Sequence, residues 1–70
     1  MPYQPISEWT TNDGTVPSDI TADTILEIIY RSGECLIWDP KQIGPSLDVD
    51  LWKFDDNVYD VNQYRKMKRV

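Results

Sequence analysis

Among its 70 residues the sequence has no histidine and a single cysteine, Cys35. The catalytic Ser-His-Asp triad and the Cys-His pair use histidine as their base, so composition alone excludes both mechanisms. A structural zinc site needs about four cysteine or histidine ligands, of which this chain supplies one. We therefore expect Cys35 to behave as a small apolar side chain rather than as a nucleophile.

Glycine is also scarce, and Gly14, Gly33 and Gly44 stand far apart in the chain. None of them precedes a Gly-Lys-Ser/Thr step, so the phosphate-binding loop of nucleotide hydrolases is missing. The sequence therefore predicts a protein that is not an enzyme and that uses no cofactor and no metal. A carboxylate-only metal site is the one exception left open, although the acidic residues do not follow the twelve-residue calcium loop.

Long apolar runs are missing as well. No stretch approaches the roughly 20 apolar residues that a membrane-spanning helix needs. The first residues, Met1 to Pro5, have neither a basic start nor an apolar segment, so they predict no secretory signal. We expect a cytoplasmic protein without membrane contact, in agreement with the unpaired cysteine.

Charge is uneven along the chain, which carries twelve acidic and seven basic side chains, a formal net charge of −5. Four of the basic residues lie close to the C-terminal end: Arg65, Lys66, Lys68 and Arg69. An acidic body repels a phosphate backbone, so we expect no general nucleic-acid binding. The same charge permits the opposite role, an acidic mimic of nucleic acid that occupies a basic protein groove.

The central part of the sequence indicates β-structure. Residues 24–31 are rich in isoleucine and alternate between two faces, and Ser32-Gly33 then forms a turn into a second apolar run, residues 34–38. A helix over residues 21–32 is the alternative, because Ile25, Leu26, Ile28 and Ile29 also fit helical spacing. The strand reading is preferred.

Two further strands are predicted, a short one at residues 51–54 and a longer one at residues 58–66. The predicted fold is mainly β, a small antiparallel sheet of three to four strands in meander order with an extended N-terminal arm; the alternative is an α+β fold. One domain spans residues 1–70, divided into the arm (1–20), the sheet (24–66) and a basic tail (67–70). Because a domain this short has a small core without disulfide or metal, we expect a homo-oligomer.

Two groups of residues are candidates for function. The first combines aromatic rings, which stack on bases or guanidinium groups, with arginines, which bind phosphate or carboxylate. Its members are Tyr30, Arg31, Trp38, Trp52, Tyr64 and Arg65. The second is an acidic face suited to docking a basic partner, made of Asp48, Asp50, Asp55, Asp56 and Asp60. Both groups also allow a purely structural interpretation. In the first, the rings fill the core and the arginines form ion pairs at its margin; in the second, the aspartates form a solvated face.

From Trp9 onward the chain resembles a group of small phage and prophage accessory proteins. Trp9, Gly14 and Pro17 are similar to the opening of that family, residues 25–33 to its alternating strand and turn, and Trp52 to its lone tryptophan. Residues 60–65, Asp-Val-Asn-Gln-Tyr-Arg, are similar to its closing strand. Ser32 stands where the family prefers aspartate, and the chain continues with a longer basic end.

The resemblance implies a compact β-protein that acts inside a bacterial host cell, and it transfers no catalytic residue. Its leading functional implication is a protein that binds and neutralises a host protein, with Trp52 and Tyr64 as anchors beside the acidic face. The alternative is an oligomeric sponge for a small nucleotide signal, with Arg31 and Arg65 on the phosphate and a tryptophan on the base.

Overall fold

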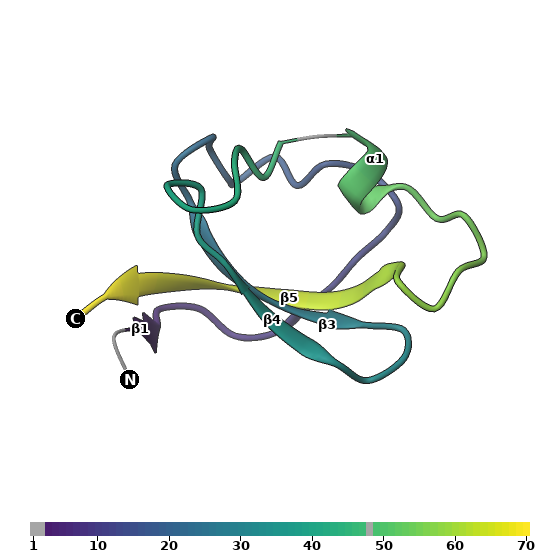
Figure 1. The fold of residues 1–70 in the computed structure, drawn as a ribbon, viewed down its shortest axis with the longest axis horizontal. Coiled ribbons are helices and arrows are strands. Elements are labelled where there is room, and N and C mark those ends of the chain that lie inside the picture. Colours follow the sequence, from purple (N-terminus) through teal and green to yellow (C-terminus); the bar gives the residue numbers. More distant parts are fainter. Residues whose placement is uncertain (1–2, 48) are drawn as a thin grey trace.

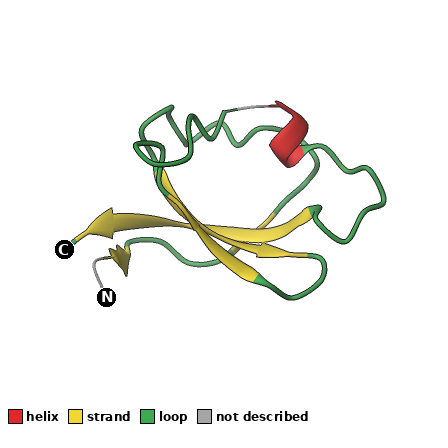
Figure 2. Cartoon of the chain, in the orientation of Figure 1, coloured by secondary structure: helices red, strands yellow, loops and turns green. Residues whose placement is uncertain are grey.

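The computed structural model describes residues 3–47 and 49–70. In these residues five strands form one curled antiparallel sheet, and one short helix lies over one of its faces (Figures 1 and 2). The elements are β1 (Tyr3–Pro5), β2 (Thr10–Thr11), β3 (Ile25–Tyr30), β4 (Cys35–Trp38), α1 (Val49–Trp52) and β5 (Val61–Arg69). The prediction of a mainly β fold is confirmed, and the helical alternative for residues 21–32 is wrong.

Strand β5 lies at the centre of the sheet, whose order is β1-β5-β3-β4, with β2 also paired to β5. The predicted meander is therefore wrong, because β5 pairs with β3 rather than with a neighbour in sequence. The predicted N-terminal arm is part of the sheet. Its two short strands extend the sheet along the free edge of β5, Tyr3 opposite Arg69 and Thr10 opposite Tyr64.

The β3–β4 hairpin forms as predicted but turns differently. The Gly33 amide donates to the Tyr30 carbonyl at 2.9 Å, and the Tyr30 amide donates to the Glu34 carbonyl at 2.8 Å. These bonds close a three-residue turn, Arg31 to Gly33, rather than the predicted two-residue one. Gly33 has φ +93°, the left-handed conformation that such a turn needs at its last position.

The predicted strand at residues 51–54 is wrong, because α1 ends there at Trp52. A strand would place Trp52 and Phe54 on the same face, whereas Trp52 is fully buried and Phe54 is 52% exposed. The last strand is also shifted: it covers Val61–Arg69 instead of residues 58–66. Most of the predicted basic tail is therefore part of β5.

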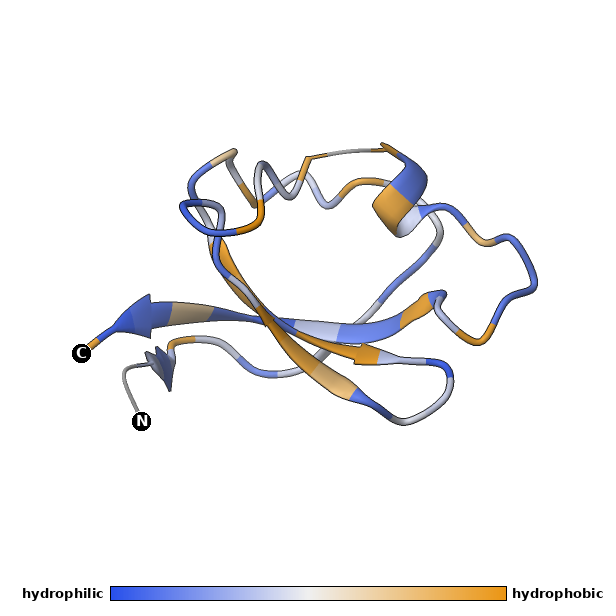
Figure 3. Ribbon diagram, in the orientation of Figure 1, coloured by the Kyte–Doolittle hydropathy of each residue, from blue (hydrophilic) through white to orange (hydrophobic). Residues whose placement is uncertain are grey.

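The core lies on one face of the sheet, which we call the inner face. Leu26 and Ile28 of β3 and Val61 of β5 pack there around Trp52, whose ring meets the ring of Tyr64 edge to face at 5.0 Å. The loops of residues 12–24, 39–47 and 53–60, with α1, cover this face (Figure 2). Apolar residues are prominent in β3 and β4, whereas β5 is mostly hydrophilic (Figure 3).

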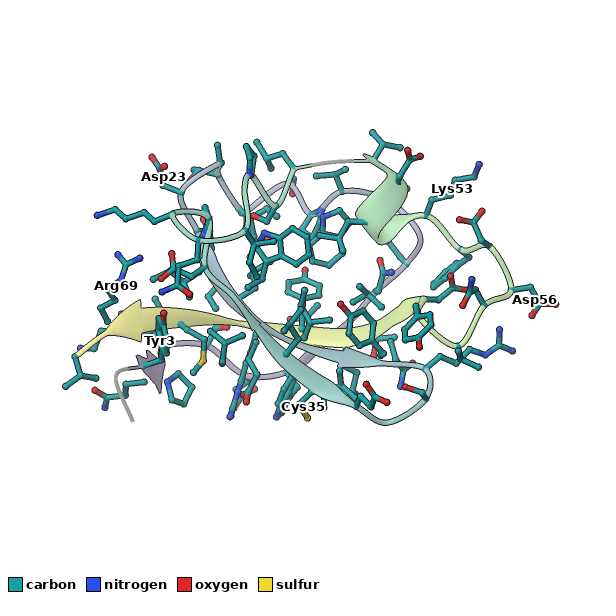
Figure 4. The ribbon with its side chains drawn as sticks, viewed as in Figure 1. Tyr3, Asp23, Cys35, Lys53, Asp56 and Arg69 are labelled. Carbon is teal, nitrogen blue, oxygen red and sulfur yellow. The ribbon has the colours of Figure 1, made fainter. Side chains whose placement is uncertain are left out.

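Two buried polar side chains join the cover to the sheet. Asn12 Nδ2 donates to the carbonyls of Trp52 and Val61, each at 2.9 Å, and so links α1, β5 and the arm. The Asp39 carboxylate accepts from the Tyr3 hydroxyl at 2.8 Å and from Arg69. It thereby ties the end of β4 to the β1–β5 pair (Tyr3 and Arg69 in Figure 4).

Candidate binding site at the hairpin end

The six aromatic and arginine candidates lie in different environments in the structure. Trp52 and Tyr64 are core residues, 0% and 7% exposed. The Trp52 indole N–H donates to the Ser46 carbonyl at 2.7 Å, so its polar atom is also satisfied internally. The expectation that these two rings anchor a partner is therefore corrected: they stabilise the fold.

Trp38 and Tyr30 are half-buried at the margins of the core. The Trp38 indole N–H donates to the Gly44 carbonyl at 2.8 Å, which fixes the loop after β4. The Tyr30 ring meets Tyr59 edge to face at 5.9 Å, and burial raises the pKa of its hydroxyl, with Glu34 adding to the shift. Both rings act mainly as packing residues.

The two arginines have separate partners. On the outer face of the sheet, Arg65 lies 2.5 Å from the Glu27 carboxylate, and its guanidinium is 4.4 Å from the centre of the Trp9 ring. Arg31 follows β3 in the hairpin turn and pairs with Asp56. The pocket lined by Arg31 and the open groove lined by Arg65 are distinct, so one chain does not bring both arginines onto one phosphate.

The acidic group is divided as well. The buried Asp60 carboxylate accepts from the backbone amides of Asn57 and Asp55, each at 3.1 Å. These amides lower the pKa of Asp60 despite its burial, so the residue holds the 55–60 loop in place. Asp50, Asp55 and Asp56 are exposed. The prediction for Asp48 lies outside the described residues.

A pocket of about 430 Å³ forms where this loop meets the hairpin. The Arg31 amide donates to the Asp60 carbonyl at 2.8 Å and the Ser32 amide to the Val58 carbonyl at 3.0 Å, which brings the two segments together. The pocket combines apolar and charged side chains from three segments. Its lining residues are Arg31, Phe54, Asp56, Asp60, Val61 and Asn62. We call this the hairpin pocket.

Phe54 supplies the exposed aromatic surface of the hairpin pocket. Gly14, at φ +89°, packs directly against its ring: a Cβ at this glycine would lie 2.9 Å from Phe54 Cδ2. The glycine therefore allows the half-exposed ring to pack closely against the backbone. An exposed aromatic ring held in place by its surroundings is a common feature of binding sites, since little entropy is lost when it is covered.

Charges of both signs line the mouth of the hairpin pocket. Arg31 Nη1 lies 2.8 Å from Asp56 Oδ1, with the side chains 56% and 93% exposed. The Asp56 hydrogen bond and charge raise the pKa of Arg31. Asp56 has φ +54°, an unusual conformation for a residue with a side chain. An ion pair this exposed contributes little stability and can exchange for a partner's charge.

Sequence reasoning named three residues of this pocket, Arg31, Asp56 and Asp60, but missed Phe54. Of the aromatic residues in that region it favoured Trp52, because tryptophan is enriched in binding surfaces. The available signal was the Asn12-Asp13-Gly14 run, whose composition is typical of a turn and whose glycine permits a close approach by another segment. Its contact with Phe54, 40 residues away, follows from the tertiary fold alone.

No protein-family model, curated protein or solved structure matches this chain. In the described ranges 3–47 and 49–70, no helix is long and apolar enough to cross a membrane.

Proposed function

We propose that the protein is a non-enzymatic binding protein that acts by occupying a surface of another protein through the hairpin pocket. The observation that carries this proposal is the half-exposed Phe54 ring, which packs against Gly14 and lines a pocket with charged rims. Aromatic anchors in preformed pockets, surrounded by polar residues, dominate the energy of many protein interfaces.

Charge supports a basic partner. Asp55 and Asp56 are exposed beside the pocket, and the chain carries a net charge of −5. Such a surface attracts a positively charged protein and speeds the encounter at low salt. An incoming lysine or arginine can replace Arg31 on Asp56, because that ion pair is exposed to solvent.

The resemblance to small phage proteins supports a bacterial host protein as the target. Neutralising a host enzyme of defence or nucleic-acid metabolism fits an acidic protein that covers a basic groove. This part of the proposal depends on the resemblance, whereas the protein-binding activity depends on the hairpin pocket.

A capture experiment tests the proposal. The immobilised protein is exposed to lysate of the bacterial host at low and physiological salt, alongside Phe54→Ala and Asp56→Asn. We expect one defined basic protein to bind the wild type, and its capture to fall at least about tenfold with Phe54→Ala, as for an interface anchor. Ile6→Ala is the control, because Ile6 is 57% exposed on a different surface. Equal capture by all variants, or capture of nothing at either salt, overturns the proposal.

We further propose that the protein self-associates. The main core cluster of the described residues is small, consisting of Ile20, Leu26, Ile28, Trp52, Val61 and Tyr64, with Ile25 and Met67 buried outside it. Domains of this length rarely obtain more than about 3–5 kcal/mol from one core, and a second copy adds buried surface without new sequence.

A further inference from the structure

Strand β4 forms an edge of the sheet, since β3 is its one neighbour in the strand order. Its four residues, Cys35-Leu36-Ile37-Trp38, are all apolar and partly exposed. Natural edge strands are usually protected against further pairing by a charge, a proline or a bulge. None of these interrupts Cys35–Trp38, and Pro40 comes only after the strand has ended.

The hydrogen-bond pattern shows which backbone groups this edge leaves free. The Tyr30 amide donates to the Glu34 carbonyl, so the backbone groups of Glu34 face β3. Leu36 and Trp38, two and four residues further along, face β3 in the same way. In an antiparallel pair, alternate residues bond to the neighbour and the residues between them point away. The N–H and C=O groups of Cys35 and Ile37 therefore point to the free edge.

We propose that β4 pairs with β4 of a second copy of this chain, antiparallel about a two-fold axis, to give one continuous sheet. This inference specifies the interface of the self-association proposed above and rests on it. The four residues carry no charge, so two copies with net charge −5 meet here without like charges inside the paired strands. A strongly charged foreign strand finds no complementary charge in this strand.

The structure also selects the register. Residues that point to the free edge must lie opposite one another, so Cys35 can face Cys35, Ile37 or Asp39 of the partner subunit. The first register requires Gly33 to pair with the partner strand, and it is excluded because Gly33 is held in the hairpin turn at φ +93°. The last register requires Asp39 to pair with the partner strand, and it is excluded because the Asp39 carbonyl already accepts from the amides of Gln42 and Ile43, both at 2.9 Å.

The remaining register places Cys35 opposite Ile37 of the partner subunit and puts Leu36 on the two-fold axis. The backbone groups of Cys35 and Ile37 then bond reciprocally, and both side chains lie on the outer face beside Ile29. In Figure 4 the Cys35 side chain points away from the loops that cover the inner face. Because the paired strands are short, we expect a weak, concentration-dependent dimer.

Cross-linking tests this register. In the double variant C35A/L36C, the two introduced thiols face each other across the axis at a non-hydrogen-bonded pair, where Cα atoms are about 4.5 Å apart and a disulfide can form. Oxidised glutathione accepts the two electrons and two protons and leaves as two reduced molecules. We expect most of the chain to become a covalent dimer. C35A/D23C, with its thiol at an exposed turn, is the control and should stay largely monomeric.

A charge at the edge gives a second test that does not depend on disulfide geometry. Cys35 is exposed, so Cys35→Lys should fold while placing a cation in the interface. We expect the dimer dissociation constant, measured by sedimentation, to rise at least about tenfold, a difference of about 1.4 kcal/mol. Ala22→Lys adds the same charge at another exposed position and should change it less than about twofold.

The outcomes separate the two proposals. A monomer at every concentration overturns both self-association and the β4 interface. A dimer that neither cross-links in C35A/L36C nor responds to Cys35→Lys overturns the β4 interface and leaves self-association standing. Cross-linking together with weakening by Cys35→Lys supports both.

Discussion

The two faces of the sheet are built from the same strands but differ in what covers them. The inner face packs Leu26 and Ile28 against Trp52 beneath loops and α1. The outer face carries the Glu27–Arg65 pair, the Trp9 ring and the partly exposed Ile29 and Ile37. The comparison teaches that this small protein places most of its core on the inner face, whereas on the outer face Ile25 and Met67 are buried and Ile29 and Ile37 stay partly exposed.

Removing the centre of the inner face should have the largest effect. Trp52→Ala deletes a fully buried ring, and we expect it to lower the free energy of unfolding by about 3–5 kcal/mol. Phe54→Ala, at the half-exposed neighbour, should cost less than about 1 kcal/mol. Urea denaturation of both variants checks this. Similar losses from the two changes would contradict the division between core and binding surface.

The second-largest effect is expected from the buried hydrogen bonds that join the covering loops to the sheet. Asn12→Ala leaves the carbonyls of Trp52 and Val61 without their donor in a buried place, so we expect a loss of about 1–3 kcal/mol in the free energy of unfolding. The neighbouring Thr11 is exposed, and Thr11→Ala should stay within about 0.5 kcal/mol of the wild type. If thermal and chemical denaturation give both variants the same free energy of unfolding, the Asn12 side chain does not join α1 to the sheet.

The Asp39 link predicts a dependence on pH. Burial alone would raise the pKa of Asp39, but hydrogen bonds from Tyr3, Arg69 and the Lys41 amide outweigh it and lower the pKa below 3.8. A lowered folded pKa means that the carboxylate stabilises the protein above its ordinary pKa, and that this contribution is lost as the pH falls through the folded value.

Melting curves across the acid range test that dependence. Asp39→Asn should be less stable than the wild type near neutral pH, and the difference should shrink as the pH falls below about 4. Asp23→Asn, at an exposed turn, serves as the matched carboxyl control. A difference that stays constant down to low pH would show that Asp39 acts through shape rather than charge.

The smallest effect is expected on the outer face. A double-mutant cycle with Glu27→Gln and Arg65→Met should give a coupling energy of less than about 1 kcal/mol that shrinks with added salt, because both side chains keep contact with water. Denaturation at low and high salt measures it. A coupling above about 2 kcal/mol, insensitive to salt, would mean that the outer face is as dry as the inner one.

The candidate site was only partly predictable from sequence. Charge and turn chemistry pointed to Arg31, Asp56 and Asp60, which do meet at the hairpin pocket. The aromatic partner was misassigned, since nothing local distinguishes the buried Trp52 from the exposed Phe54. That distinction depends on α1, which turns Trp52 toward Tyr64, and on Gly14, which packs against Phe54 from the far end of the chain.

The sequence by itself determined the β-class of the fold, the hairpin around Gly33, and the absence of histidine chemistry. These are local or compositional properties: alternation predicts a strand, and glycine supplies the left-handed turn. Only the tertiary structure decided that β5 lies between β1 and β3, that residues 49–52 form a helix, and that β4 remains an edge. Strand pairing depends on which apolar faces can be buried together, and that choice is made by contacts between residues far apart in the chain.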